Sequence, residues 1–210
     1  KYLGIIYIIM SAFCFAFMNA FVRLAGDLPP TQKSFFRNFV ALIFAVIILI
    51  KNKIPFKYQK KSNIPALLVR GGIGTLGILC NFYAIDHLAL ADASMLNKMS
   101  PFFVIVFSFI FLRERLTFFQ GAAVFMAFIG SLFIIKPSFN VEVVPALLGL
   151  IGGMSAGAAY TAVRYLGQHG EKGPFIVAFF SGFSCLTTLP FLIFDYHPMT
   201  FTQLLCLLWA

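Results

Sequence analysis

The chain has 210 residues, of which 60% are apolar and only 11% carry a charge. Soluble domains hold roughly 45–50% apolar and 25% charged residues, so this composition excludes a soluble globular protein. The formal net charge is +9, and on a membrane protein such an excess reflects cytoplasmic Lys and Arg rather than nucleic-acid binding. The four cysteines fall inside apolar runs without a CxxC spacing, so we expect free thiols.

The apolar residues gather into continuous runs of about 20 residues, the length that a helix needs to cross a bilayer. Continuous rather than alternating runs predict helices, not barrel strands, so the expected fold class is all-α integral membrane. The predicted spans are, in chain order, 2–24, 34–50, 65–85, 93–112, 118–135, 144–166 and 175–194. An eighth span is expected to begin near Phe201 and to be cut off at Ala210.

Basic residues in the short connections predict which ends of the spans face the cytoplasm. One side collects nine of them, namely Lys51, Lys53, Lys57, Lys60, Lys61, Arg113, Arg115, Arg164 and Lys172. The opposite side has four, namely Arg23, Lys33, Lys98 and Lys136. The richer side is predicted to be cytoplasmic, which predicts a multi-pass protein of the cell (cytoplasmic) membrane with its N-terminus in the cytoplasm.

A shift of 144 residues aligns the start of the chain with a later part of it. The matched residues are Gly26 with Gly170, Pro30 with Pro174, and Phe35, Phe36 and Phe39 with Phe179, Phe180 and Phe183. Five spans separate the copies, an odd number, so the second copy enters the membrane from the opposite face, as in inverted-repeat transporters. We therefore expect a first repeat over 1–137 and a second over 144–210 that is truncated in its third helix.

Several short segments together form a pattern seen in one transporter family. Phe36-Arg37-Asn38 opens the second span, and Asn81-Phe-Tyr83-Ala-Ile ends the third. The most specific piece is Phe111-Leu-Arg-Glu114-Arg-Leu-Thr117-Phe-Phe-Gln120-Gly121. The chain thus resembles an EamA domain of the drug/metabolite transporter (DMT) superfamily, best over residues 1 to about 137.

The resemblance implies a ten-helix transporter built of two inverted five-helix repeats, with a substrate cavity between the halves and alternating access. It implies a secondary active transporter for a small metabolite (an amino acid, a nucleoside-like or another amphipathic solute) or a drug. A passive channel and a non-transporting membrane scaffold or enzyme stay open as alternatives, although clustered acids, His or Cys at membrane depth, as an enzyme would need, are not seen. We expect no cofactor and no nucleic acid; coupling to a proton or ion gradient and a homodimer are left open.

Polar side chains inside the spans are the candidates for substrate binding, because a polar group in hydrocarbon needs a partner. Asn19 and Asn81 are the amides predicted to lie deepest, and they either bond between helices or line the cavity. Tyr83 and Tyr160 are candidates for the same cavity, with an aromatic belt as the alternative. We expect Arg37 and Arg70, each within about a turn of a span end, to be membrane anchors.

Lys98 lies about six residues into the fourth span, roughly 9 Å along a helix. It either extends back to the surface or places a cation in the cavity, where it would favour a carboxylate or phosphate. Pro101 is expected to kink the helix just beyond it, because proline cannot donate a backbone hydrogen bond to the carbonyl of Asn97.

The Arg-Glu-Arg turn after the fourth span is predicted to serve structure and topology. Arg113 and Arg115 act as cytoplasmic anchors, with Glu114 between them. Thr117 and Gln120 have the spacing of a capping box for the following helix. The three histidines lie in separate loops, so no metal site is expected.

Overall fold

The computed structural model describes residues 3–26, 28–113, 117–135 and 142–209, and all regular structure within them is helical. The α-helices are α1 (Leu3–Leu24), α2 (Pro30–Lys51), α3 (Ile64–His87), α4 (Leu90–Asn97), α5 (Ser100–Leu112), α6 (Phe118–Ile135), α7 (Val143–Gln168), α8 (Gly173–Phe194) and α9 (Phe201–Trp209). A short 3-10 turn, Lys61–Asn63, leads into α3. The prediction of an all-α fold is confirmed.

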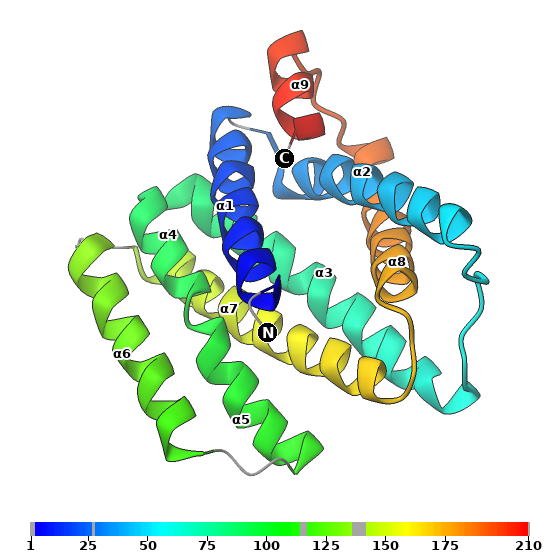
Figure 1. Ribbon diagram of the computed structural model, residues 1–210. Helices are drawn as coiled ribbons and strands as arrows, with labels where there is room; N and C mark the ends of the chain where they lie inside the picture. The colour runs from blue at the N-terminus through cyan, green and yellow to red at the C-terminus, as the bar shows by residue number, and fades with distance from the viewer. Residues whose placement is uncertain (1–2, 27, 114–116, 136–141, 210) are drawn as a thin grey trace.

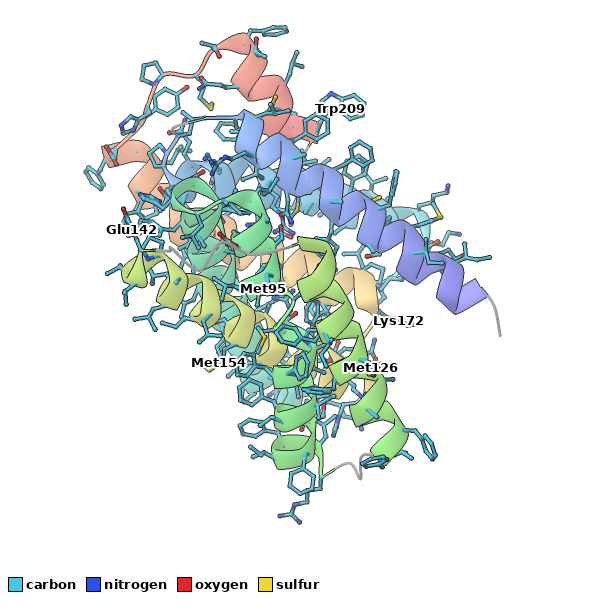
Figure 2. All side chains as sticks on the ribbon, turned by 90° about the vertical axis from the view of Figure 1, so that its left-hand side faces the viewer. Met95, Met126, Glu142, Met154, Lys172 and Trp209 are labelled. Carbon is cyan, nitrogen blue, oxygen red and sulfur yellow. The ribbon has the colours of Figure 1, made fainter. Side chains whose placement is uncertain are left out.

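Five helical stretches are long and apolar enough to cross a membrane. They are Pro30–Lys51, Lys61–His87, Leu90–Leu112, Val143–Gln168 and Gly173–Phe194. The apolar stretches found in α1 and α6 are shorter, Ile9–Leu24 and Gly121–Gly130. Large apolar side chains project from the outer faces, including Met126 of α6 and Met154 of α7 in Figure 2, as expected of surfaces that face lipid.

The helices form two closely packed pairs. The helix α3 runs beside α7, and α2 crosses α8 (Figure 1). The short helices α4 and α5 lie against α7, while α6 lies outside them, next to both. On the other side of the molecule, α1 contacts α9 and the end of α3.

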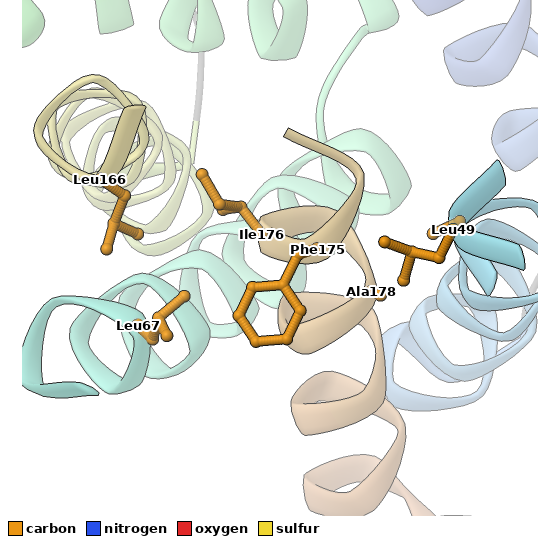
Figure 3. Close-up of a cluster of buried hydrophobic side chains, with 7 residues drawn as sticks. Leu49, Leu67, Leu166, Phe175, Ile176 and Ala178 are labelled. Carbon is orange, nitrogen blue, oxygen red and sulfur yellow. The ribbon is translucent and has the colours of Figure 1, made fainter. Parts of the chain in front are cut away.

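The largest apolar cluster joins both halves of the chain. Figure 3 shows Leu49 of α2 and Leu67 of α3 gathered around Phe175 and Ile176 of α8, with Leu166 of α7 beside them. All five side chains are 5% exposed or less. This cluster lies near the ends of these helices, so the centre of the molecule stays free for polar side chains.

The fourth span is divided in the middle of its apolar run. The helix α4 ends at Asn97 and α5 begins at Ser100, so Lys98 and Met99 link two helices. The Lys98 N–H donates to the Ser94 carbonyl at 3.0 Å, which closes the last turn of α4. Pro101 lies in the first turn of α5, the position in which a helix tolerates proline because the missing N–H would have had no partner.

Glycines on α7 allow the divided span to approach closely. A Cβ atom on Gly153 would lie 2.6 Å from the Leu96 carbonyl oxygen, and one on Gly157 would lie 2.9 Å from that of Ser100. Neither distance is compatible with a side chain. Small residues four apart let membrane helices pack backbone to backbone. Here Gly153 and Gly157 lie against backbone carbonyls on either side of the break.

The connections before α2 and α8 turn in the same way. Gly26 has φ +70° and Gly170 has φ +90°, in the left-handed region that only glycine adopts at no steric cost. After each turn comes a helix with proline in its first turn, α2 at Pro30 and α8 at Pro174. Gly26 and Gly170 are 144 residues apart, as are Pro30 and Pro174, so both pairs match in the 144-residue shift.

Polar contacts lie at both ends of the helix bundle. The ammonium of Lys33 on α2 is fully buried and pairs with the Asp86 carboxylate of α3 at 2.5 Å. Close to this pair, Arg23 donates to the carbonyls of Ile85 and Leu88. At the opposite end, the Glu171 carboxylate accepts hydrogen bonds from the Gln59 N–H and the Asn63 amide, both at 2.8 Å.

Candidate functional site

Two adjoining cavities lie where α1, α3, α4 and α7 converge. The smaller has a volume of about 160 Å³ and is also lined by α2 and α8. The larger has a volume of about 800 Å³ and lies between α1 and the broken span. Phe15, Asn97 and Tyr160 line both, so the two cavities meet at these side chains.

Four of the five predicted substrate-binding residues line these cavities. Asn81 lines the smaller cavity, Asn19 and Lys98 line the larger, and Tyr160 lines both. The side-chain oxygen of Asn19 is buried and has no hydrogen-bond partner among the described residues. It is therefore an acceptor that a ligand can use, because a buried polar atom without a partner is costly.

Tyr83 lines neither cavity. Its ring stacks on the ring of His87 with centroids 4.0 Å apart, and its carbonyl lies 2.9 Å from the Nδ1 atom of His87. The residue lies one helical turn before the exposed end of α3, where a tyrosine ring is commonly found at a membrane interface.

Lys98 follows the last residue of α4 and its side chain is exposed to the larger cavity. The break at Lys98 and Met99 places it beside Pro101 in the cavity wall. A continuous helix would present Lys98 from a regular helical surface, whereas here it stands at the junction of two helices.

Arg37 and Arg70 both line the smaller cavity. The sequence predicted both to be membrane anchors, because each lies within about a turn of a predicted span end. The helix α2 begins at Pro30, four residues before the predicted start, which puts Arg37 seven residues, roughly 10 Å, inside the helix. Arg70 is similarly six residues from the start of α3. The signal that sequence reasoning missed is Pro30, whose ring favours the first turn of a helix.

Both arginines are fixed by contacts that do not neutralise their charge. The guanidinium carbon of Arg70 lies 3.9 Å from the centroid of the Phe180 ring on α8, a cation–π contact. The Nε atom of Arg37 lies 3.2 Å from the sulfur of Met18 on α1. Gly74 gives Arg70 its room, since a side chain at that position would collide with the guanidinium.

Asn38, the neighbour of Arg37, has a structural role. It is fully buried and donates to the Ser184 hydroxyl of α8 at 2.9 Å and to the Ser34 carbonyl at 2.8 Å. In the Phe36-Arg37-Asn38 segment, therefore, the arginine faces the cavity while the asparagine ties α2 to α8.

The described residues on either side of the family-pattern turn, Arg113 and Thr117, line neither cavity. Arg113 is exposed and ends α5 in a left-handed conformation, with its N–H donating to the Ser108 carbonyl. Thr117 is exposed and its carbonyl accepts from the Gly121 N–H at 3.3 Å. Glu114, Arg115 and the side chain of Gln120 lie outside the described residues, so the capping box stays a prediction. The described residues hold no cluster of three His, Cys, Asp or Glu side chains that could bind a metal ion.

An all-helical membrane protein whose cavities place a few polar side chains between apolar helices has the build of a membrane transporter. The profile of the EamA-like transporter family matches residues 2–136, well over half of the chain, and the chain belongs to this family. The earlier assignment to the DMT superfamily is thereby confirmed, and the family identifies a transporter rather than an enzyme.

Related proteins are also named as transporters. The chain is 35% identical over 195 residues to the pseudopaline exporter CntI of Pseudomonas aeruginosa, a match that covers 92% of the chain and 67% of the exporter. It is 29% identical over 137 residues to human solute carrier family 35 member G1, covering 65% of the chain and 37% of that protein. A riboflavin transporter of Brucella anthropi is 26% identical over 162 residues, covering 75% and 56% of the two chains. The chain thus spans about two thirds of the length of the exporter.

Proposed function

We propose that the protein is a secondary active transporter that moves a small polar or amphipathic metabolite across the cytoplasmic membrane by alternating access. The observation that carries this is the pair of joined cavities between the helices, each with a few polar side chains in a largely apolar wall. Their walls come from α1 to α5 on one side and from α7 and α8 on the other. A site shared by two packed units can open to either face when the units tilt against each other.

The helix contacts support two inverted repeats, the first over 1–137 and the second from 144, as the basis of a ten-helix transporter. Under the 144-residue shift, α1 corresponds to α7, α2 to α8, and α9 to the segment that leads into α3. A two-fold axis in the membrane plane maps the α2–α8 pair onto itself, and it converts contacts of the segment before α3 with the second repeat into contacts of α9 with the first repeat. The α2–α8 pair is closely packed, and α9 contacts α1 and α2.

Two hydrogen bonds lie at related places in the proposed repeats. The Gln59 N–H donates to Glu171 beyond the Gly170 turn, and the Gln203 amide donates to the Ala25 carbonyl before the Gly26 turn at 3.0 Å. Gln59 and Gln203 are 144 residues apart. Each therefore ties the segment before a third helix to the first turn of the other repeat, one at each end of the bundle.

These contacts also suggest how access alternates. The Glu171 bonds join the two repeats at the lysine-rich end, which we propose faces the cytoplasm together with the N-terminus. At the other end, the Gln32 amide and the His197 backbone exchange two hydrogen bonds, at 2.9 and 3.1 Å. A carrier must break the hydrogen bonds at one end of the bundle while it keeps those at the other end. A channel would have both ends open at the same time.

Flux across proteoliposomes tests the proposal. A carrier coupled to a proton or ion gradient accumulates solute against its gradient only while that driving gradient is present. Equal, purely downhill flux with and without the gradient would indicate a channel, and no flux of any solute in a metabolite library would indicate a scaffold. One chain lines both cavities, so a homodimer, if it forms, would hold two such sites.

Replacing Lys98 with glutamine is expected to lower transport about tenfold without lowering the amount of protein in the membrane. The reason is the loss of a cation in the wall of the larger cavity. The control is Lys57→Gln, which removes the same charge from an exposed loop. Transport by Lys98→Gln at the level of the control would remove Lys98 from the site.

Tyr160 and Tyr83 form a matched pair. Tyr160→Phe removes a hydroxyl from the junction of the two cavities, and we expect transport to fall about five- to tenfold, the cost of one hydrogen bond of about 1–1.5 kcal/mol. Tyr83→Phe removes the same group outside both cavities and should change transport less than twofold. The apparent KM and maximal rate of both variants check this, and a larger loss in Tyr83→Phe would contradict the assignment.

A further inference from the structure

We propose that Arg37 and Arg70 form a binding site for the carboxylate group of an organic anion, which would be the transported substrate. The inference rests on the proposed transport function and adds the chemical class of the solute. Its starting point is the placement of two guanidinium groups in one small cavity at the centre of a membrane protein.

The first step concerns charge. Arginine stays protonated in proteins, so both side chains carry a full positive charge. Both arginine side chains and that of Tyr160 line the same small cavity. None of the described residues that line the two cavities is an aspartate or a glutamate. Two neighbouring cations without a protein counter-charge favour the binding of an anion.

The second step concerns hydrogen bonding. The terminal nitrogen Nη1 of Arg37 and the Nε of Arg70 are buried and have no hydrogen-bond partner among the described residues. A guanidinium presents its donors as a planar fork that matches the two oxygens of a carboxylate. The unused donors and the absence of an acidic partner in the described cavity lining therefore both favour a carboxylate as the ligand group.

The third step concerns size. A volume of about 160 Å³ is below the roughly 300–1,000 Å³ of a typical small-molecule site, so the smaller cavity suits a charged head group better than a whole metabolite. The adjoining cavity of about 800 Å³ lies within the usual range for a small-molecule site. A carboxylate held by the arginines would thus leave the body of the molecule to pass Asn97 and Tyr160 toward Lys98.

The fourth step concerns position relative to the two repeats. Arg37 lies on α2 and contacts α1, whereas Arg70 lies on α3 and stacks on Phe180 of α8. An anion between them is held at the boundary between the proposed repeats. A ligand shifts a conformational equilibrium only through different contacts in the two states, and a boundary site supplies such a difference.

The test measures binding to the full-length protein in nanodiscs, separately from transport. The probes are succinate and 3-phenylpropionate, each beside its neutral amide, succinamide and 3-phenylpropionamide, and inorganic phosphate as a second oxyanion. At least one acid is expected to raise the unfolding temperature in a concentration-dependent way, while its amide does not. Arg37→Gln and Arg70→Gln should each weaken that binding at least tenfold.

Arg113→Gln is the matched control, because it removes an exposed arginine outside both cavities. It should bind the acid like the unaltered protein. Equal binding in all three variants would overturn the proposal, as would the absence of stabilisation by either acid. Stabilisation by phosphate alone would also overturn it and assign the pair to phosphate. Since Arg37→Gln or Arg70→Gln could fail to fold, Arg37→Lys and Arg70→Lys keep the charge but lose the fork, and should bind with intermediate affinity.

Flux in proteoliposomes separates this inference from the proposed function. Acid binding that depends on the arginines, without flux of any solute, would refute transport and leave the anion site standing. Flux that is unchanged in Arg37→Gln and Arg70→Gln would keep the transporter and remove the anion site.

Discussion

Replacing Lys33 with methionine is expected to destabilise the protein by about 3–5 kcal/mol, the cost of removing one partner from a buried ion pair. The Lys33 ammonium is fully buried and Asp86 is its partner at 2.5 Å. Methionine fills nearly the same space, so the loss reflects the carboxylate left behind rather than a cavity. The fraction of protein that stays folded and monodisperse after heating measures the effect.

The double variant Lys33→Met with Asp86→Asn is the informative companion. It removes the stranded charge and should recover most of the lost stability, because the cost lies in an unpaired buried ion. Lys61→Met, at an exposed position, controls for the loss of one positive charge and should change stability by less than about 0.5 kcal/mol. A double variant as unstable as Lys33→Met alone would contradict this explanation, because the loss would then not come from the unpaired carboxylate of Asp86.

Replacing Gly157 with alanine is expected to destabilise the protein by about 1–3 kcal/mol, the usual cost of overpacking. The added Cβ would lie 2.5 Å from the Cβ of Phe103 and 2.9 Å from the Ser100 carbonyl oxygen, so α5 would have to move away from α7. Because α5 follows the break beside the larger cavity, transport should fall as well. Thermal stability and flux of the same preparation test both effects.

Gly72→Ala is a control that is expected to change stability in the opposite direction to Gly157→Ala. Gly72 lies in the interior of α3, and a Cβ atom there would have no heavy atom within 4 Å. Alanine favours helix by about 0.5–1 kcal/mol over glycine, so this variant should be slightly more stable. If both substitutions moved stability in the same direction, the close contact of α7 with α5 would not explain the result.

Much of the fold follows from the sequence because a membrane restricts the choices so strongly. Apolar runs of about 20 residues can only be helices in a bilayer, so the positions of the spans follow directly. The start of α2 was misplaced because Thr31, Gln32 and Lys33 are polar and read as a loop. Two of them are in fact buried by contacts with distant residues, Gln32 with His197 and Lys33 with Asp86, and these contacts have no trace in a local pattern.

The cavity residues show the same limit. Asn81, Tyr160 and Lys98 stand out in sequence because each interrupts an apolar run, and all three line the cavities. Arg37 and Arg70 interrupt such runs equally, but arginine near a helix end is usually an anchor. Whether an arginine near a helix end faces lipid head groups or a cavity depends on helix packing. For Arg70, the roles of Gly74 and Phe180 become visible only when α3 and α8 are placed together.

The glycines of α7 and the break in the fourth span have a consequence for how this sequence can change. Leu96 in the last turn of α4 and Ser100 at the start of α5 lie on either side of the break, and their carbonyls lie against Gly153 and Gly157. Replacing Pro101 with a good helix former would favour a straight helix and shift these carbonyls away from their glycines. Substitutions at Pro101 and at the two glycines should therefore be non-additive, so that one tolerates change only in the background of the other.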